Sequence, residues 1–571
     1  MLRKPLPLLI AFLLSPTLAH AEEVDLTIKG LKGSAEDNVD AYLSSIPPEE
    51  YRTDLRFQAR VQRIITEALN AVGYYHPTFK FEVSEQNNEL IVTVNRGKPL
   101  IIKEADIQIS GEAEGDVDFI LLVKNSKLTK GRRLNHGDYD SLKSKIRNLA
   151  LQKGYFDGSY SMTRLEVSPD LNQAFVRLHF DSGIRYHFGE HQITGSQIKL
   201  DRVESLAPFE QGDPYLVSSV GEFNQNLSNS DWFSSVLVEP DLSYLGQGRE
   251  LPMKVSVEPQ ARNQLETGLG YSTDVGVRGS LKWKKPWVNS RGHSINSSLE
   301  LSKPEQTITA SYRIPQSDAL NDYYSINYGL KNLDKRDTKS LESNISVGRT
   351  QRLENGWNRT VFIRYLLENF EQGLQDDSSQ FLFGGISFAR SRIRGGAMPH
   401  WGDSQQITLE YGDPSALSET RVTRVMGGMK WIRSAGENHR GLFRIDGAAN
   451  FAEDYDKLSP SLRFFAGGDN NLRGYGYESI SPLDESGSLT GAKYMLTTSL
   501  EYQYRLYGNW WGAVFYDYGD AFDDQPDFKR GTGAGIRWAS PVGPIRLDFA
   551  WGLDQEPVSE YRIHFTLGPE L

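Results

Sequence analysis

From about residue 265 to the end, the chain consists largely of short segments in which apolar and polar residues alternate. In the segment 443–451, Phe443 and Ile445 fall on one face of an extended strand and Arg444 on the other. Such strands suit a wall with lipid outside and water inside, and only a closed barrel satisfies all strand backbone groups in hydrocarbon. At roughly 10 residues per strand plus connections, this half predicts a transmembrane antiparallel β-barrel of about 16 strands.

The N-terminus has the features of a secretory signal peptide over residues 1–21. A basic start is followed by an apolar core, Leu8 to Leu14, and by Ala19-His20-Ala21, a small-x-small cleavage signal. A retained anchor is the less favoured alternative, because the apolar core is too short to cross a bilayer. Together with the predicted barrel, this export signal predicts that the protein lies in the bacterial outer membrane, with its N-terminal domains in the periplasm.

Composition excludes several classes of function. The chain contains 0 cysteines, which excludes disulfides, thiolate metal sites and cysteine nucleophiles. Its formal net charge of −11 argues against a nucleic-acid binder. The 10 histidines show no metal-ligand spacing, and Gly402-Asp403-Ser404 lies between predicted strands without a placed histidine. We therefore expect no enzyme activity, no metal and no cofactor.

Residues 22 to about 263 contain a unit that repeats with a period of roughly 80 residues. In each copy a helix ends and aromatic residues follow, as at Gly73-Tyr74 and Gly154-Tyr155, with a weaker third copy at Asp231-Trp232-Phe233. Glycine suits the end of a helix because it tolerates positive φ. Each unit is predicted to hold two helices over a small three-stranded sheet. The predicted domains are 22–99, 100–184, 185–263 and the barrel, 264–571.

An exposed sheet edge on such a unit can bind a partner's extended strand through backbone hydrogen bonds. We expect the units to serve as docking sites for this reason, since three tandem copies are more than a spacer needs. The alternative is that they only set a distance.

Three segments near the C-terminus carry the most specific motif. The first is the glycine-rich Leu472-Arg473-Gly474-Tyr475-Gly476-Tyr477, which reads as a loop. The other two are strand-like and place Glu501 and Asp517 on their polar faces. Both carboxylates would then point into the lumen from adjacent strands, and a loop folded inward could place Arg473 between them. A guanidinium fork suits two carboxylates better than a lysine would.

Two further patterns accompany this motif. Gly531, Gly533 and Gly535 recur at period two, on one face of a predicted strand, where they let another segment pack closely. Tryptophans such as Trp510 and Trp511 are predicted to belong to the aromatic girdles of the barrel rather than to a ligand cage.

These segments resemble the Arg-Gly-Tyr/Phe loop and its Glu- and Asp-bearing strands in the BamA/TamA superfamily of outer-membrane assembly factors and two-partner secretion transporters. The repeated units look like the polypeptide-transport-associated (POTRA) domains of that superfamily, and 266–272 looks like its first barrel strand. Three units make the chain most similar to the TamA branch, and so does the ending 568–571.

The resemblance implies a latch and a seam. In the latch, Arg473 with Gly474 and Tyr475 would hold the loop to Glu501 and Asp517. The seam would lie between the first and last strands, weakly paired so that it opens toward lipid, and would involve Leu265, Thr267, Leu269, Tyr271, Ile563, Phe565 and Leu567.

The implied function is assembly or secretion of client β-barrel proteins such as autotransporters. The implied partners are unfolded clients, outer-membrane lipid and a TamB-like protein anchored in the inner membrane. One alternative is a two-partner-secretion transporter that passes a client through the lumen, and a passive porin is another. A third is that the latch residues only prop the loop inside the lumen.

Overall fold

A computed structural model describes residues 24–84, 86, 88–396, 398–540, 543–555 and 561–567. The predicted signal peptide and the ending 568–571 lie outside the described residues. The chain forms two compact units. One comprises the N-terminal part through Glu190 with 209–220 and 240–253, and the other comprises 191–208, 221–239 and the residues from 254 onward.

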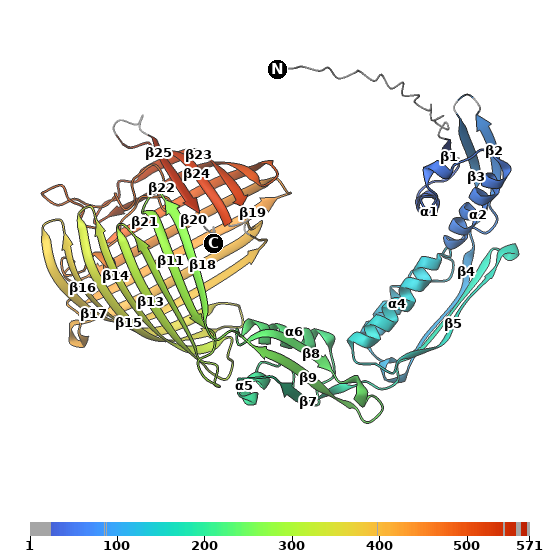
Figure 1. Cartoon of the computed structure of the whole chain (residues 1–571), viewed down its shortest axis with the longest axis horizontal. Helices are drawn as coiled ribbons and strands as arrows, with labels where there is room; N and C mark the ends of the chain where they lie inside the picture. Colours follow the sequence, from blue (N-terminus) through green and yellow to red (C-terminus); the bar gives the residue numbers. More distant parts are fainter. Residues whose placement is uncertain are drawn as a thin grey trace, which may run out of the picture. The chain divides into compact units, whose positions relative to one another are not determined.

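The second unit contains one antiparallel sheet of 16 strands in sequence order, which curves into a barrel (Figure 1). This confirms the predicted fold of the C-terminal half. Its strands are β10 (Gln264–Ser272), β11 (Gly276–Lys285), β12 (Ser294–Ser302), β13 (Glu305–Pro315), β14 (Asp322–Lys335), β15 (Thr338–Arg352), β16 (Asn358–Gln372), β17 (Gln375–Arg394), β18 (Trp401–Gly412), β19 (Val422–Ala435), β20 (His439–Ala452), β21 (Tyr494–Tyr507), β22 (Trp510–Phe522), β23 (Lys529–Ser540), β24 (Gly543–Gly552) and β25 (Tyr561–Leu567).

The alternation in sequence becomes the two faces of the barrel wall. On β21 the side chains of Leu500, Tyr502 and Tyr504 are exposed, whereas those of Glu501 and Gln503 are buried. Successive side chains of a strand point to opposite faces, so the apolar set lies on the outer wall and the polar set on the inner wall.

The N-terminal part contains three three-stranded sheets, in the orders β1-β3-β2, β4-β6-β5 and β7-β9-β8. In the first two sheets the central strand pairs in parallel with the first strand and antiparallel with the second. The elements are β1 (Asp25–Lys29), α1 (Ser34–Leu43), α2 (Leu55–Ala71), β2 (Thr78–Ser84), β3 (Glu89–Asn95), β4 (Ile101–Ser110), α3 (Val117–Lys124), α4 (His136–Gln152), β5 (Ser159–Ser168), β6 (Gln173–Asp181), β7 (His187–Thr194), α5 (Leu200–Glu204), α6 (Val217–Asn229), β8 (Phe233–Pro240) and β9 (Glu250–Pro259).

The residue two positions after each of the helices α2, α4 and α6 has positive φ. It is Gly73 at +87°, Gly154 at +82° and Asp231 at +61°, and aspartate is one of the few other residues that tolerate this region. The aromatic residue that follows is buried in all three copies. The repeat therefore marks the point where a helix ends and the chain turns into its core. No helix among the described residues has both the length and the apolar character needed to cross a membrane.

Candidate functional site

The loop between β20 and β21 carries the Arg-Gly-Tyr motif and packs against the inner wall. Gly474 has φ of +92°, and a Cβ at this position would lie 2.6 Å from the backbone nitrogen of Gly552. Tyr475 is buried and its hydroxyl donates to the carbonyl oxygen of Arg530 at 3.2 Å. A glycine is therefore required where the loop meets β24, and the tyrosine holds the loop to β23.

Arg473 lies between the two carboxylates that the sequence singled out. Its Nε and Nη2 donate to Asp517 Oδ2 and Oδ1 at 2.8 and 2.9 Å, and its Nη1 donates to Glu501 Oε2 at 2.6 Å. The guanidinium carbon lies 3.4 Å from the centre of the Phe515 ring. All these contacts are buried in the wall formed by β21 and β22, so the side chain is held on three sides.

Two charged residues that the sequence did not single out complete the network. Asp548 on β24 accepts from Arg473 Nη1 at 3.3 Å, and Arg537 on β23 donates to Asp548 Oδ1 at 2.6 Å and to Glu501 Oε1 at 3.0 Å. Two guanidinium groups thus meet three carboxylates, all of them buried. Their positions on the polar faces of β23 and β24 were a usable signal, but alternation does not say which residues stand side by side across strands.

Other atoms pack closely against the three glycines of β23, among them the loop backbone and one carboxylate of the network. A Cβ on Gly531 would lie 2.1 Å from the carbonyl oxygen of Arg473, and one on Gly535 would lie 1.9 Å from Asp548 Oδ1. A Cβ on Gly533 would lie 2.1 Å from the carbonyl oxygen of Phe549. The period-two glycines therefore leave room for the loop backbone and for the side chains beneath it.

Replacing Gly531 with alanine should displace the loop, because the new methyl group would overlap the Arg473 carbonyl. We expect a loss of stability of about 1–3 kcal/mol, as for other overpacked sites, measured as a lower urea midpoint of the purified barrel. Gly384→Ala is the matched control, since a Cβ there meets nothing within 4 Å. Equal midpoints for the two variants would contradict the close packing of the loop on β23.

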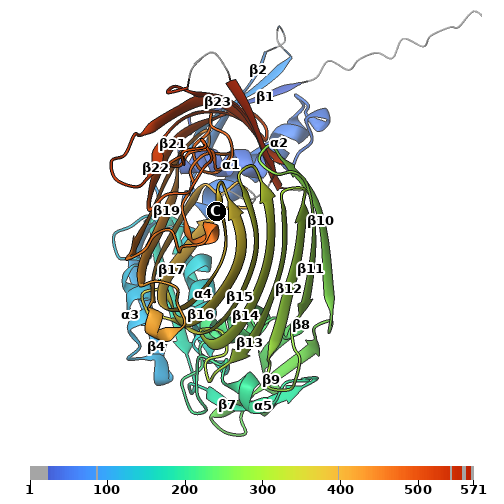
Figure 2. The same ribbon diagram turned by 90° about the vertical axis from the view of Figure 1, so that its left-hand side faces the viewer.

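The predicted seam lies between β10 and β25, the two ends of the sheet order. The backbone nitrogen of Thr273, just after β10, donates to the carbonyl oxygen of Phe565 at 3.4 Å, and the Phe565 nitrogen donates to Thr273 Oγ1 at 3.1 Å. The rings of Tyr271 and Phe565 are 6.1 Å apart. Figure 2 shows β10 in green beside the red C-terminal strands. These contacts lie at one end of β10.

Among the described residues, the half of β10 that begins at Leu265 has a neighbouring strand on one side only, β11. The side-chain Nη2 of Arg278 on β11 donates to the carbonyl oxygen of Leu567, the last described residue of β25, at 3.2 Å. Within the described part of the chain, no strand follows along Leu265, Thr267 and Leu269. A cavity of about 530 Å³ lies here, lined by residues 268–270 and by the end of β25.

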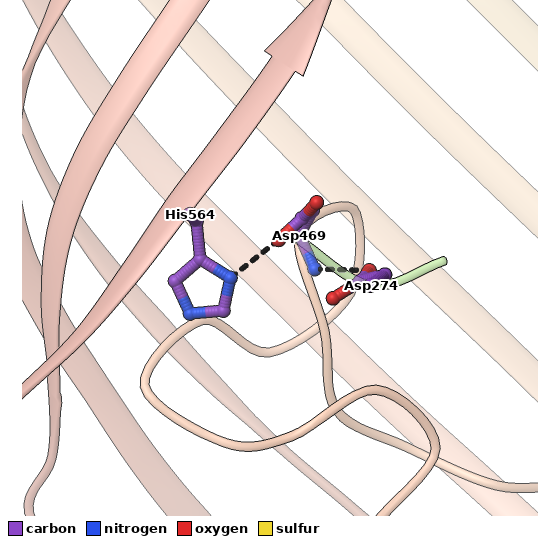
Figure 3. A group of neighbouring side chains, drawn as sticks. All are labelled: Asp274, Asp469 and His564. Atoms are coloured by element: carbon purple, nitrogen blue, oxygen red, sulfur yellow. Dashed lines mark hydrogen bonds and ion pairs between the residues drawn. The ribbon is translucent and has the colours of Figure 1, made fainter. Parts of the chain in front are cut away.

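Three side chains join the seam to the latch loop (Figure 3). His564 on β25 contacts Asp469 of the loop through Nδ1, and its Nε2 accepts from the backbone nitrogen of Gly474 at 3.0 Å. Asp274, in the turn after β10, accepts from the Asp469 nitrogen at 2.9 Å. The loop thus contacts the last strand, β25, and the turn that follows the first strand, β10.

The same three residues could geometrically hold a metal ion, since their ligand atoms lie within 4.8 Å of one another. A neutral imidazole has one N–H and one acceptor nitrogen. Because Nε2 of His564 accepts from Gly474, Nδ1 carries the proton and donates to Asp469. This proton occupies the position that a metal would need, so we assign the group to hydrogen bonding between loop and seam.

The seam contains a carboxyl with a shifted pKa, that of Asp274, which lies in a turn outside the strands. Burial, and then the neighbouring Asp469 carboxylate, raise the pKa of Asp274 to about 7. An unfolded chain ionises its aspartates near pH 4. As the pH rises from about 4 to about 7, the unfolded state releases this proton while the folded state keeps it, so the free energy of unfolding falls.

Wild-type protein should accordingly be more stable at about pH 5 than at about pH 8, whereas Asp274→Asn should lose most of this dependence. The measurement is the urea midpoint of unfolding across this range. Asp376→Asn, at an exposed position of β17, is the control and should keep the wild-type profile. An unchanged profile in Asp274→Asn would show that this carboxyl does not titrate at the seam.

Comparison with known proteins agrees with this architecture. The Omp85 superfamily domain matches residues 259–570, and the first POTRA domain of TamA matches residues 25–96. These matches and the fold define an outer-membrane β-barrel with N-terminal POTRA sequence in the periplasm. The chain belongs to the Omp85 superfamily, with an architecture similar to that of TamA.

Individual relatives are more distant. The outer membrane protein assembly factor BamA of Nitratidesulfovibrio vulgaris is 24% identical over 384 residues, which cover 62% of this chain and 48% of that protein. Outer envelope protein 80 of Arabidopsis thaliana is 30% identical over 125 residues, 20% of this chain and 15% of that protein. The chain therefore spans less than half the length of these curated relatives.

Among solved structures, the crystal structure of BamA from Haemophilus ducreyi lacking POTRA domains 1–3 is similar, with a TM-score of 0.69. The match has 15% sequence identity and covers 82% of this chain and 99% of that one. At this level of identity the likeness concerns the fold.

Proposed function

We propose that this protein helps client β-barrel proteins, such as autotransporters, to fold into or cross the outer membrane. The observation that carries the proposal is that β10 and β25, the two ends of the sheet order, form no ladder with each other among the described residues, and that a cavity lies beside Leu269 and Leu567. An unpaired edge offers backbone donors and acceptors to another strand. A client strand that adds to this edge forms its hydrogen bonds as it enters lipid, where unmet backbone groups are costly.

The latch residues regulate this seam in the proposed mechanism. Arg473 anchors the loop to β21, β22 and β24, while Asp469 and Gly474 of the same loop contact His564 on the last strand. Hydrogen bonds to charged groups contribute about 1.5–3 kcal/mol each. A loop held by such bonds can release and rebind, and each movement alters the support of β25.

The N-terminal part is proposed to consist of three POTRA-type domains, 22–99, 100–184 and 185–263. The family match to 25–96 and the recurrence of the three-stranded sheet support this division. Strands β2, β5 and β8 each lie at an edge of their sheet. Such an edge suits an extended segment of a TamB-like partner or of a client, through strand addition.

The rival function is a two-partner-secretion transporter, which would move a client through the lumen. On that route the latch loop must leave the inner wall, where Arg473 and Tyr475 are buried. A seam mechanism leaves the lumen filled. The two routes therefore differ in whether a client strand can be cross-linked to β10 or to the inner wall.

The test is folding of an unfolded autotransporter barrel into liposomes that hold this protein. We expect faster client folding than in liposomes with an equal amount of an unrelated porin, and cross-links from the client to residue 267 or 269. Equal rates in both liposomes would overturn direct assembly by this protein alone. Cross-links confined to the lumen would favour secretion through the barrel.

A further inference from the structure

The outer wall of the barrel carries a group of arginines where β17 ends. Ile386 and Phe388 of β17 pair with Leu409 and Ile407 of β18, which are exposed on the outer wall. Alternation along a strand then places Arg390, Arg392 and Arg394 on this same outer face. The strand passes directly from an apolar stretch to three successive outward arginines.

These arginines lie at the periplasmic end of the barrel. Strand β10 follows the N-terminal domains and starts at that end, and each neighbouring strand runs in the opposite direction. The end of β17, the start of β18 and the end of β19 therefore all lie there. β17 has 20 residues, about twice the 9–11 that a tilted strand needs to cross the hydrocarbon, so part of it lies outside the hydrocarbon, and the outward arginines at its end mark that end as one such part.

Three of the guanidinium groups lie around the ring of one tryptophan. Trp401 of β18 pairs with Arg394 of β17 and with Arg433 of β19. The guanidinium carbons of Arg394, Arg433 and Arg392 lie 4.9, 4.6 and 5.5 Å from the centre of its ring. Such contacts are favourable for each cation, but they also bring three like charges to one ring. Arg390 lies 4.8 Å from the centre of the nearby Trp357 ring.

Among the described residues, the carboxylate that contacts this group is that of Asp403. Asp403 is fully buried and accepts from Nε and Nη2 of Arg392 at 3.0 and 2.9 Å, while Nη2 of Arg433 lies 3.6 Å from its Oδ2. The side chains of Arg392 and Arg433 remain 51% and 49% exposed, and Arg394 is exposed as well. Asp403 thus contacts two of the four guanidinium groups, and Arg392, Arg394 and Arg433 keep exposed surface for an anion.

We propose that Arg390, Arg392, Arg394 and Arg433, around Trp401, bind the phosphate groups of anionic phospholipids in the periplasmic leaflet. Arg390 is the first outward residue of β17 after apolar Phe388, and such a change from apolar to charged side chains is expected where hydrocarbon gives way to headgroups. Tryptophan is favoured at this same depth, and arginine binds phosphate oxygens in a bidentate manner. The proposal rests on the outer-membrane location and not on the assembly function.

The test uses the full-length protein in detergent, titrated with short-chain phosphatidylglycerol and, separately, with short-chain phosphatidylethanolamine. Each arginine near an anionic membrane surface is worth about a fivefold change in affinity. The double variant Arg394→Gln/Arg433→Gln should therefore bind phosphatidylglycerol about 25-fold more weakly. It leaves the Arg392–Asp403 pair in place, and Arg394→Gln alone should give about a fivefold loss.

The matched control is Lys339→Gln/Arg421→Gln, which removes two exposed positive charges at the opposite end of the barrel. It should bind phosphatidylglycerol as the wild type does. An equal loss in the control, or an unchanged affinity in both arginine variants, would overturn the proposal. So would equal binding of phosphatidylethanolamine by the wild type, or full competition by inorganic phosphate at the same concentration, because either result would remove the preference for anionic lipid.

Discussion

Arg473→Ala should abolish acceleration of client folding and destabilise the barrel by about 3–5 kcal/mol, the usual effect of removing one partner from a buried ion pair. Asp517, which is 0% exposed, would lose its buried counter-charge and keep only the neutral donors, the backbone nitrogen of residue 473 and the Ser499 hydroxyl. Arg537 would remain as the cation for Glu501 and Asp548. Client folding in liposomes and the urea midpoint of the purified protein measure the two effects.

Two further variants distinguish the specific hydrogen bonds of Arg473 from the effect of removing a positive charge. Arg473→Lys keeps the charge but cannot donate from three nitrogens in one plane, so it should recover only part of the stability. Arg421→Ala removes an exposed arginine paired with Asp413 and Glu453, and such surface pairs contribute about 0–1 kcal/mol. If Arg473→Ala folds client as fast as the wild type does, the network only props the loop.

Alternation was sufficient to predict most of the barrel. It gives the class of fold, because a lipid-facing wall forces one face of every strand to be apolar, while the number of strands followed from the length of this half and the end strands from the family resemblance. It also predicts which face each residue occupies. The alternation of faces corrects the prediction that Trp510 and Trp511 both belong to the outer girdle. Trp510 stacks with Trp538, whereas Trp511 lies near buried Arg440 on the inner side. Trp511 is therefore not part of the outer girdle.

The sequence could not predict the full latch network, because that depends on register between strands. Asp548 reaches Arg473 because it stands opposite Gly535, and Arg537 stands two residues further along β23. Alternation is unchanged when a whole strand slides by two residues, so it cannot fix these pairs. The contacts of His564 with Asp469 and Gly474 also depend on the path of a 41-residue connection between β20 and β21, which follows no period.

Closing the seam with a covalent link should stop client folding completely and reversibly. The rings of Tyr271 and Phe565 face each other across the seam at 6.1 Å, and the chain has 0 cysteines of its own. In Tyr271→Cys/Phe565→Cys, a short reductant-cleavable bifunctional thiol reagent would therefore join β10 to β25 alone. We expect client folding to fall to the rate of protein-free liposomes, and to recover when reductant cleaves the link.

Phe549→Cys/Ile563→Cys is the matched control, since these residues are paired within β24 and β25. The same reagent then links two strands that are already joined, and leaves β10 free to part from β25. Thr273 and Phe565 share two hydrogen bonds, at 3.4 and 3.1 Å, and these would have to break when β10 parts from β25. Client folding that survives the seam link would show that the client does not enter between these strands, and would leave the lumen as its route.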